Sequence, residues 1–142
     1  MILLDAYALL AYLLNEPAAD HVMSILRGGE CSISSVNLTE VLDQLQRLHG
    51  LPAGEIAEVV SALLTEVIVV RSVGEVEAWR AADVRARHYR RKDAELSLAD
   101  CILLASATEG ESIATSDPVL AAAARSESVS VIALPDSHGQ KP

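Results

Sequence analysis

The chain has 142 residues, which fits one domain, and 51% of them are hydrophobic, which is enough to form a core. Its net charge of −9 makes it a poor general binder of polyanions, and an aromatic content of 3% argues against surfaces that stack on single-stranded nucleic acid. Cys31 and Cys101 lack zinc-ligand spacing, so we expect reduced core thiols.

The apolar run 6–14 is too short to span a bilayer and follows no basic segment, so we expect neither a membrane anchor nor a signal peptide but a cytoplasmic protein. Further along, short apolar runs alternate with segments of helical periodicity. The order predicted along the chain is strand 2–4, helix 5–14, a helix ending near residue 27, strand 31–34, helix 36–49, helix 52–65, strand 67–70, helix 73–92, helix 97–108, strand 112–115, helix 117–125 and strand 129–134. The β-branched run 67–70 is expected to be a buried strand.

Strands that alternate with helices, without hairpin signals, predict an α/β fold in three α/β/α layers around a parallel sheet of about five strands. We expect the strand order 3-2-1-4-5. One domain is predicted over residues 1–135, followed by a flexible tail over residues 136–142.

Four acidic residues stand where an apolar run gives way to a helix or near a helix start: Asp5, Glu40, Asp100 and Asp117. In the predicted sheet, strand ends and helix starts meet at one edge, so the four carboxylates would surround one pit. Each acid also has a purely structural explanation. Asp5 and Asp117 could each cap a helix, and Asp100 could form a capping box with Ser97. Glu40 could be an acid in the first turn of a helix, where the helix dipole favours negative charge.

Together the four acids favour a metal site, because neighbouring carboxylates repel each other unless a cation joins them. No Lys or Arg lies within four residues of Asp5, Asp100 or Asp117. Hard oxygen ligands suit Mg²⁺ or Mn²⁺, so the sequence predicts a metal-dependent enzyme that acts on a phosphate ester.

The ordered motifs resemble those of PIN-domain nucleases, most closely the VapC-type toxins of bacterial toxin–antitoxin pairs. They are an apolar run before Asp5, Ser-x-x-Asn-x-x-Glu-Val-Leu at 34–42, Leu-Ser-x-x-Asp at 96–100 with an apolar tail, and Thr-x-Asp at 115–117. The resemblance covers nearly the whole chain. It implies a Mg²⁺-dependent endoribonuclease, with Mn²⁺ as a substitute, that cleaves RNA such as tRNA or rRNA. It also implies a homodimer that a cognate antitoxin neutralises, as in type II toxin–antitoxin systems.

The resemblance makes the four acids metal ligands and catalytic residues. It also implies that Thr115 holds the last acid and that Asn37 is a polar neighbour of Glu40. The family often has Ser or Thr two residues after its first Asp, and this chain has Tyr7 there. That difference puts one supporting hydrogen bond in question, but not the metal site.

Most of the basic residues lie between Arg71 and Lys92. Arg87, Arg90 and Arg91 are candidates for contacts with the RNA backbone, and a solvated helix face balanced by nearby acids is an equal explanation.

Two other functions stay open. One is a PIN-like module that binds RNA or protein without cutting, and the other is a metal-dependent phosphatase, although Asp5-Ala6-Tyr7 lacks the second Asp of that class. A dinucleotide-binding domain is excluded, because no glycine-rich turn follows the first strand.

Overall fold

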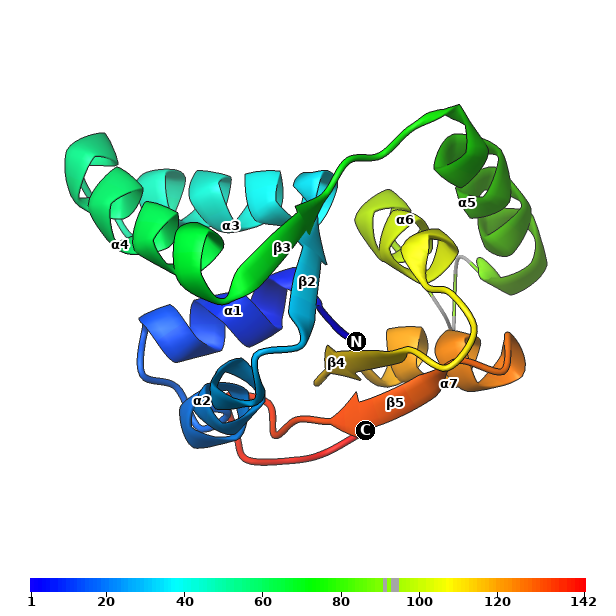
Figure 1. Cartoon of the computed structure of the whole chain (residues 1–142). Helices are drawn as coiled ribbons and strands as arrows, with labels where there is room; N and C mark the ends of the chain where they lie inside the picture. The colour runs from blue at the N-terminus through cyan, green and yellow to red at the C-terminus, as the bar shows by residue number, and fades with distance from the viewer. Residues whose placement is uncertain (91, 93–94) are drawn as a thin grey trace.

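A five-stranded parallel sheet in the order β3-β2-β1-β4-β5 forms the centre of the fold, as predicted (Figure 1). The computed structural model describes residues 1–90, 92 and 95–142. Its strands are β1 (Ile2–Leu4), β2 (Cys31–Ser34), β3 (Ile68–Arg71), β4 (Ser112–Thr115) and β5 (Ser130–Ala133). Its helices are α1 (Ala6–Leu13), α2 (Ala19–Gly28), α3 (Ser35–Arg47), α4 (Ala53–Glu66), α5 (Glu75–His88), α6 (Leu98–Ser106) and α7 (Pro118–Ser126).

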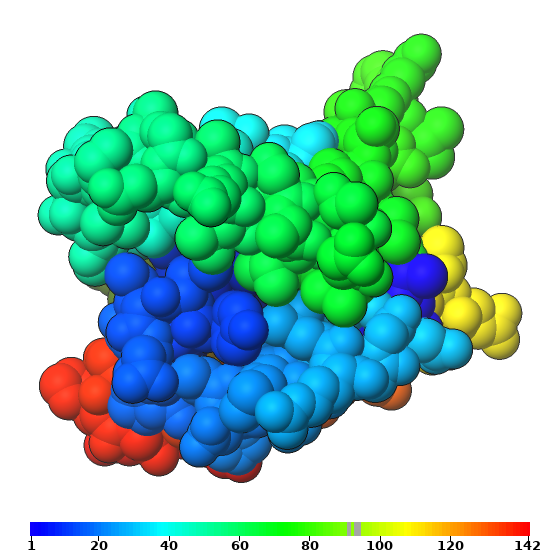
Figure 2. All heavy atoms as spheres, turned by 60° about the vertical axis from the view of Figure 1, so that its left-hand side comes forward, coloured from blue at the N-terminus to red at the C-terminus, as the bar shows by residue number. Residues whose placement is uncertain are grey.

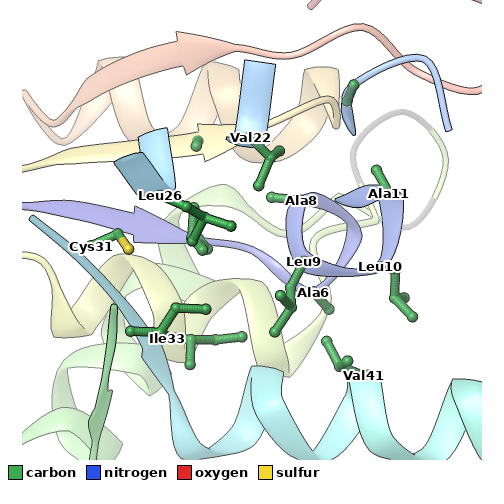
Figure 3. Packing of buried hydrophobic residues seen from close by; sticks show 14 of the residues in the cluster. Ala6, Ala8, Leu9, Leu10, Ala11, Val22, Leu26, Cys31, Ile33 and Val41 are labelled. Atoms are coloured by element: carbon green, nitrogen blue, oxygen red, sulfur yellow. The ribbon is translucent and has the colours of Figure 1, made fainter. Parts of the chain in front are cut away.

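The sheet divides the core into two apolar clusters, because successive strand residues point to opposite faces. Leu4 packs with residues of α1 to α4 on one face, whereas Leu3 packs with residues of α5 to α7 on the other. Figure 3 shows the first cluster, in which Leu9 of α1 lies near Ile33 of β2 and Val41 of α3. The three-layer α/β/α architecture predicted from the sequence is therefore confirmed.

Strand β3 is not buried, so that prediction was wrong. Val69 and Val70 are 55% and 39% exposed, and only Ile68 of this strand is buried. The reason is its position: β3 pairs with β2 alone and forms one edge of the sheet. A β-branched run indicates a strand, but it does not indicate whether that strand pairs on both sides or lies at the edge of the sheet.

Helix α5 is shorter than the predicted 73–92. It begins after Gly74, whose amide donates to the Glu77 carboxylate at 2.9 Å, and it ends at His88 because Tyr89 adopts an extended backbone. Part of the predicted helix, Arg91 included, lies outside the described residues.

The end of the chain returns to α1 and α2. Leu134 and Pro135 are buried, and the Tyr7 hydroxyl donates to the Pro135 carbonyl at 3.2 Å. Beyond them, Lys141 Nζ lies 3.4 Å from His21 Nε2 on α2. Figure 2 shows red atoms of the chain end beside blue atoms of the N-terminal part. A single domain over residues 1–135 and a flexible tail over residues 136–142 stay predictions.

In the part of the chain that the structure describes, no helix combines the length and the apolar character needed to cross a membrane.

Candidate active site

Asp5 and Asp117 leave neighbouring strands and begin helices at the same edge of the sheet. Strands β1 and β4 pair in parallel, and the Asp5 amide donates to the Ala114 carbonyl at 3.2 Å. Asp5 Oδ1 caps α1 by accepting from the Ala8 amide at 2.6 Å. Asp117 Oδ1 caps α7 by accepting from the Val119 amide at 2.6 Å. Both acids therefore lie where helix amino ends add positive potential.

Asp100 lies in the first turn of α6, where it forms a capping box with Ser97. Its Oδ2 accepts from the Ser97 hydroxyl at 2.6 Å and from the Ser97 amide at 3.2 Å, and its own amide donates to Ser97 Oγ at 3.0 Å. The predicted Asp version of the capping box is confirmed.

Glu40 lies in the second turn of α3, since the helix starts at Ser35 and has no acid in its first turn. The first-turn explanation for Glu40 is therefore wrong. Its Oε1 accepts from Gln44 Nε2 at 3.3 Å. Helix α3 packs against α6 (Figure 1), and an open groove between them is lined by Val36, Thr39, Glu40, Asp43, Ser97 and Ala99. Its walls come from distant parts of the sequence, so no motif could indicate it.

The four carboxylates are electrostatic neighbours. Asp5 is 5% exposed, and its pKa rises to about 7, chiefly through burial and further through the charges of Asp100 and Asp117. Burial also raises the pKa of Asp100, to which the charge of Asp117 adds. Burial raises the pKa of Glu40, and the charge of Asp100 adds to it. Repulsion of this kind is expected where acids gather without a cation.

Thr115 connects two of these acids. It is fully buried at the end of β4, and its Oγ1 accepts from the Asp117 amide at 2.9 Å. A hydrogen bond from its side chain also lowers the pKa of Asp5, which opposes the effect of burial. Tyr7 has different partners, because its hydroxyl donates to Pro135 and to Glu16 Oε2 at 3.4 Å. Asp5 is therefore supported by Thr115 and by the Ala8 amide.

The donor set fits a hard divalent cation, although the side chains are not drawn together around one point. Among the described residues no three His, Cys, Asp or Glu side chains already form a metal-holding group, and none of the four acids is in an ion pair. Helix caps occupy one oxygen each of Asp5, Asp100 and Asp117 and leave the second one outside the cap. These oxygens, with Glu40, suit Mg²⁺.

The basic candidates lie elsewhere and are only partly available. Arg87 makes two bonds with Glu127, from Nε at 3.0 Å and from Nη2 at 2.9 Å, and His88 Nε2 lies 2.6 Å from the same carboxylate. Arg90 is exposed, and Arg91 lies outside the described residues. Glu127 is 40 residues from Arg87, so the sequence analysis missed this pair.

The sequence model of the PIN domain matches residues 2–126, so the chain belongs to the PIN domain family. PIN domains are typically metal-dependent nucleases. The resemblance found in the sequence is thereby confirmed at the level of the family.

Solved structures share this fold, and one of them is a toxin–antitoxin complex. FitAcB from Neisseria gonorrhoeae is 22% identical with a TM-score of 0.64, covering 93% of this chain and 96% of that one. A toxin–antitoxin complex from Klebsiella pneumoniae is 17% identical with a TM-score of 0.63, covering 86% and 91%. FitAB bound to an IR36 DNA fragment is 20% identical with a TM-score of 0.66, covering 93% and 94%. At these identities the likeness is one of fold. No protein of curated function matches the sequence.

Proposed function

We propose that the protein is a Mg²⁺-dependent endoribonuclease that cleaves RNA phosphodiester bonds, with tRNA or rRNA as substrate, and that it is the toxin of a type II toxin–antitoxin system. The observation that carries the proposal is Asp5, a buried carboxylate beside Asp100 and Asp117 with no ion-pair partner among the described residues. A buried charge without a partner is costly, and a divalent cation would remove that cost. Membership of the PIN family supports the same chemistry.

Asp5, Asp100, Asp117 and Glu40 would hold Mg²⁺ or Mn²⁺ at this edge of the sheet. When bound, the cation supplies positive charge beside the scissile phosphate and makes the attacking water more acidic. Thr115 holds Asp5 and Asp117 in position. The amino ends of α1, α6 and α7 add a partial positive potential that attracts a phosphate. A carboxylate of the cluster accepts the proton of the attacking water.

The proposed assembly is a cytoplasmic homodimer that a cognate antitoxin neutralises. The likeness to FitAcB and to the Klebsiella complex supports the antitoxin partner. Exposed apolar residues at the α3–α4 connection and on α4, namely Leu48, Leu51 and Val59, offer surface for association.

Asp100→Asn tests the enzyme directly. The amide can still accept from Ser97 and preserve the capping box, but it removes a negative ligand, so we expect the discrete RNA fragments formed with Mg²⁺ or Mn²⁺ to disappear. Total RNA including tRNA and rRNA is incubated with each purified protein, with metal or with chelator. Asp43→Asn is the matched control, because Asp43 lines the groove between α3 and α6 beside Glu40 but pairs with Arg47; it should cleave like the wild type.

Fragments that persist in Asp100→Asn would contradict the assignment of the site. Absence of both cleavage and metal binding in the wild type would instead favour a PIN-like module that binds RNA or protein. A trapped phosphoenzyme would favour a phosphatase.

The proposed RNA contacts are tested by charge reversal in the basic stretch. Arg90→Glu should weaken RNA binding and reduce the slope of log affinity against log salt by about one unit, as expected for one lost phosphate contact. Arg87→Glu should chiefly lower stability, because Arg87 already pairs with Glu127. Unchanged affinity and slope after reversal of Arg87, Arg90 and Arg91 together would exclude this stretch from RNA binding.

A further inference from the structure

Asn37 has a buried hydrogen-bond donor that is not used. The side chain is fully buried in α3, and among the described residues its Nδ2 atom has no partner. A buried donor without an acceptor costs about 1–3 kcal/mol, so such groups call for an explanation. Its neighbours on the helix surface include Glu40, three residues further on.

The orientation of the Asn37 amide follows from its other contact. Asn37 Oδ1 lies 2.5 Å from Ser34 Oγ, a distance at the short end of the range for an O–H···O bond and below the range for an N–H···O bond. Ser34 Oγ also accepts from the Asn37 amide at 3.0 Å, so its own proton is left to donate to Oδ1. The unused Nδ2 is therefore on the opposite side of the amide from Ser34.

Glu40 is the least fixed of the four acids. Asp5, Asp100 and Asp117 each cap a helix, whereas the Glu40 carboxylate has one hydrogen bond among the described residues, to Gln44 at 3.3 Å. Gln44 lies one turn towards the carboxyl end of α3, and Asn37 lies one turn towards its amino end. Side chains on a helix lean towards the amino end, so the Asn37 side is within the natural reach of Glu40.

We propose that Asn37 is a positioning residue for Glu40: when a divalent cation binds, the Glu40 carboxylate leaves Gln44 and accepts a hydrogen bond from Asn37 Nδ2, which fixes it at the acid cluster. This inference rests on the proposed function. It explains two observations together, the unused buried donor and the absence of a preformed group of three ligands among the described residues. Hydrogen bonds to ligating carboxylates orient them and strengthen metal binding.

The test is a double-mutant cycle on Mn²⁺ binding, measured by calorimetry with the full chain. Asn37→Ala should weaken Mn²⁺ binding about tenfold in the wild type, but less than about twofold in the Glu40→Gln background. Gln44→Ala is the matched control on the other side of Glu40, and it should bind Mn²⁺ as tightly as the wild type or more tightly. Equal losses in both backgrounds would show that Asn37 acts without Glu40 and would overturn the proposal.

Two further measurements separate positioning from a general structural role. Ser34→Ala removes the partner of Asn37 Oδ1 but keeps the Nδ2 donor, so it should lower stability and spare Mn²⁺ affinity; a loss as large as that of Asn37→Ala would overturn the proposal.

In the wild type, Mg²⁺ should shift the NMR signals of the Asn37 side-chain amide, and this shift should be absent in Glu40→Gln. If the wild type binds Mn²⁺ normally but shows neither the coupling to Glu40 nor the NMR shift, the positioning role of Asn37 is refuted and the proposed function stands. No metal binding by the wild type would refute the proposed function as well.

Discussion

Replacement of Asp5 by asparagine is expected to abolish Mg²⁺-dependent cleavage and to stabilise the metal-free protein by roughly 4 kcal/mol above neutral pH. The variant loses a proposed ligand, and it also loses a buried charge. Asparagine is as good a helix cap as aspartate, so the bond from the Ala8 amide should persist. A gain in stability with a loss of activity is typical of a site whose residues are placed for chemistry.

The raised pKa of Asp5 determines how the stability difference between Asp5→Asn and the wild type changes with pH. The pKa of Asp5 rises from its ordinary 3.8 to about 7 in the folded protein, mainly because the group is buried. The folded state therefore holds a proton that the unfolded state has released, and the wild type loses stability as pH increases between these two values. The advantage of Asp5→Asn should be absent near pH 4, grow up to about pH 7 and stay constant above it.

Urea unfolding with chelator, at about pH 4 and about pH 8, measures this difference. Addition of Mg²⁺ at the higher pH should stabilise the wild type by mass action and leave the variant nearly unchanged. A variant less stable than the wild type at the higher pH would mean that burial of the Asp5 charge is compensated in some other way.

Glu111→Gln is expected to lower the free energy of unfolding by about 2 kcal/mol at neutral pH. Arg71 of β3 donates through Nη1 to Glu111 Oε2 at 2.9 Å and through Nη2 to Oε1, and it also donates to the Ser106 carbonyl at 2.9 Å. The pair thus connects the exposed edge strand to the end of α6 and the start of β4. Partial exposure of Arg71 allows water to screen the pair, so the loss should be smaller than for a fully buried one.

This contribution should disappear in acid. Hydrogen bonds from Arg71 and Thr108 lower the pKa of Glu111 from 4.5 to about 2. The stabilisation is therefore complete above the unfolded pKa and is lost as pH falls from about 5 towards about 2, where the two proteins should converge. Asp43→Asn is the control, because its exposed pair with Arg47 on one helix should contribute nothing measurable. A difference that does not change with pH would contradict the ionic explanation.

Local signals predicted the elements well. The strands at 2–4, 31–34 and 112–115 have the predicted limits. A helix-capping residue or a glycine lies near the ends of each of these apolar runs and marks where the strand stops. The capping roles of Asp5, Ser97 and Asp117 were also evident from the sequence. These features depend on residues within a few positions of one another, so one sequence is enough to predict them.

Contacts between distant segments were not predictable in this way. Nothing in the 67–70 run indicates that β3 has one neighbour, and nothing in α5 indicates that Arg87 meets Glu127. The strand order was predicted correctly, but the convergence of the four acids on one pit stays a prediction, because it depends on how their side chains are turned. The orientation of Glu40 towards Gln44 depends on side-chain rotation, which no sequence pattern determines.

The capping bonds affect which acidic positions can be used to recognise active nucleases among related chains. The Asp100 and Asp117 side chains make bonds that stabilise the starts of α6 and α7, so selection for folding alone would favour these two acids even in a relative without nuclease activity, whereas asparagine could replace the buried charge of Asp5 and keep its cap. Glu40 accepts no capping bond in the part of the chain that the structure describes, and folding alone gives little reason to keep it. Among related chains, an acid at the Glu40 position should therefore distinguish active nucleases from inactive relatives better than Asp100 and Asp117 do.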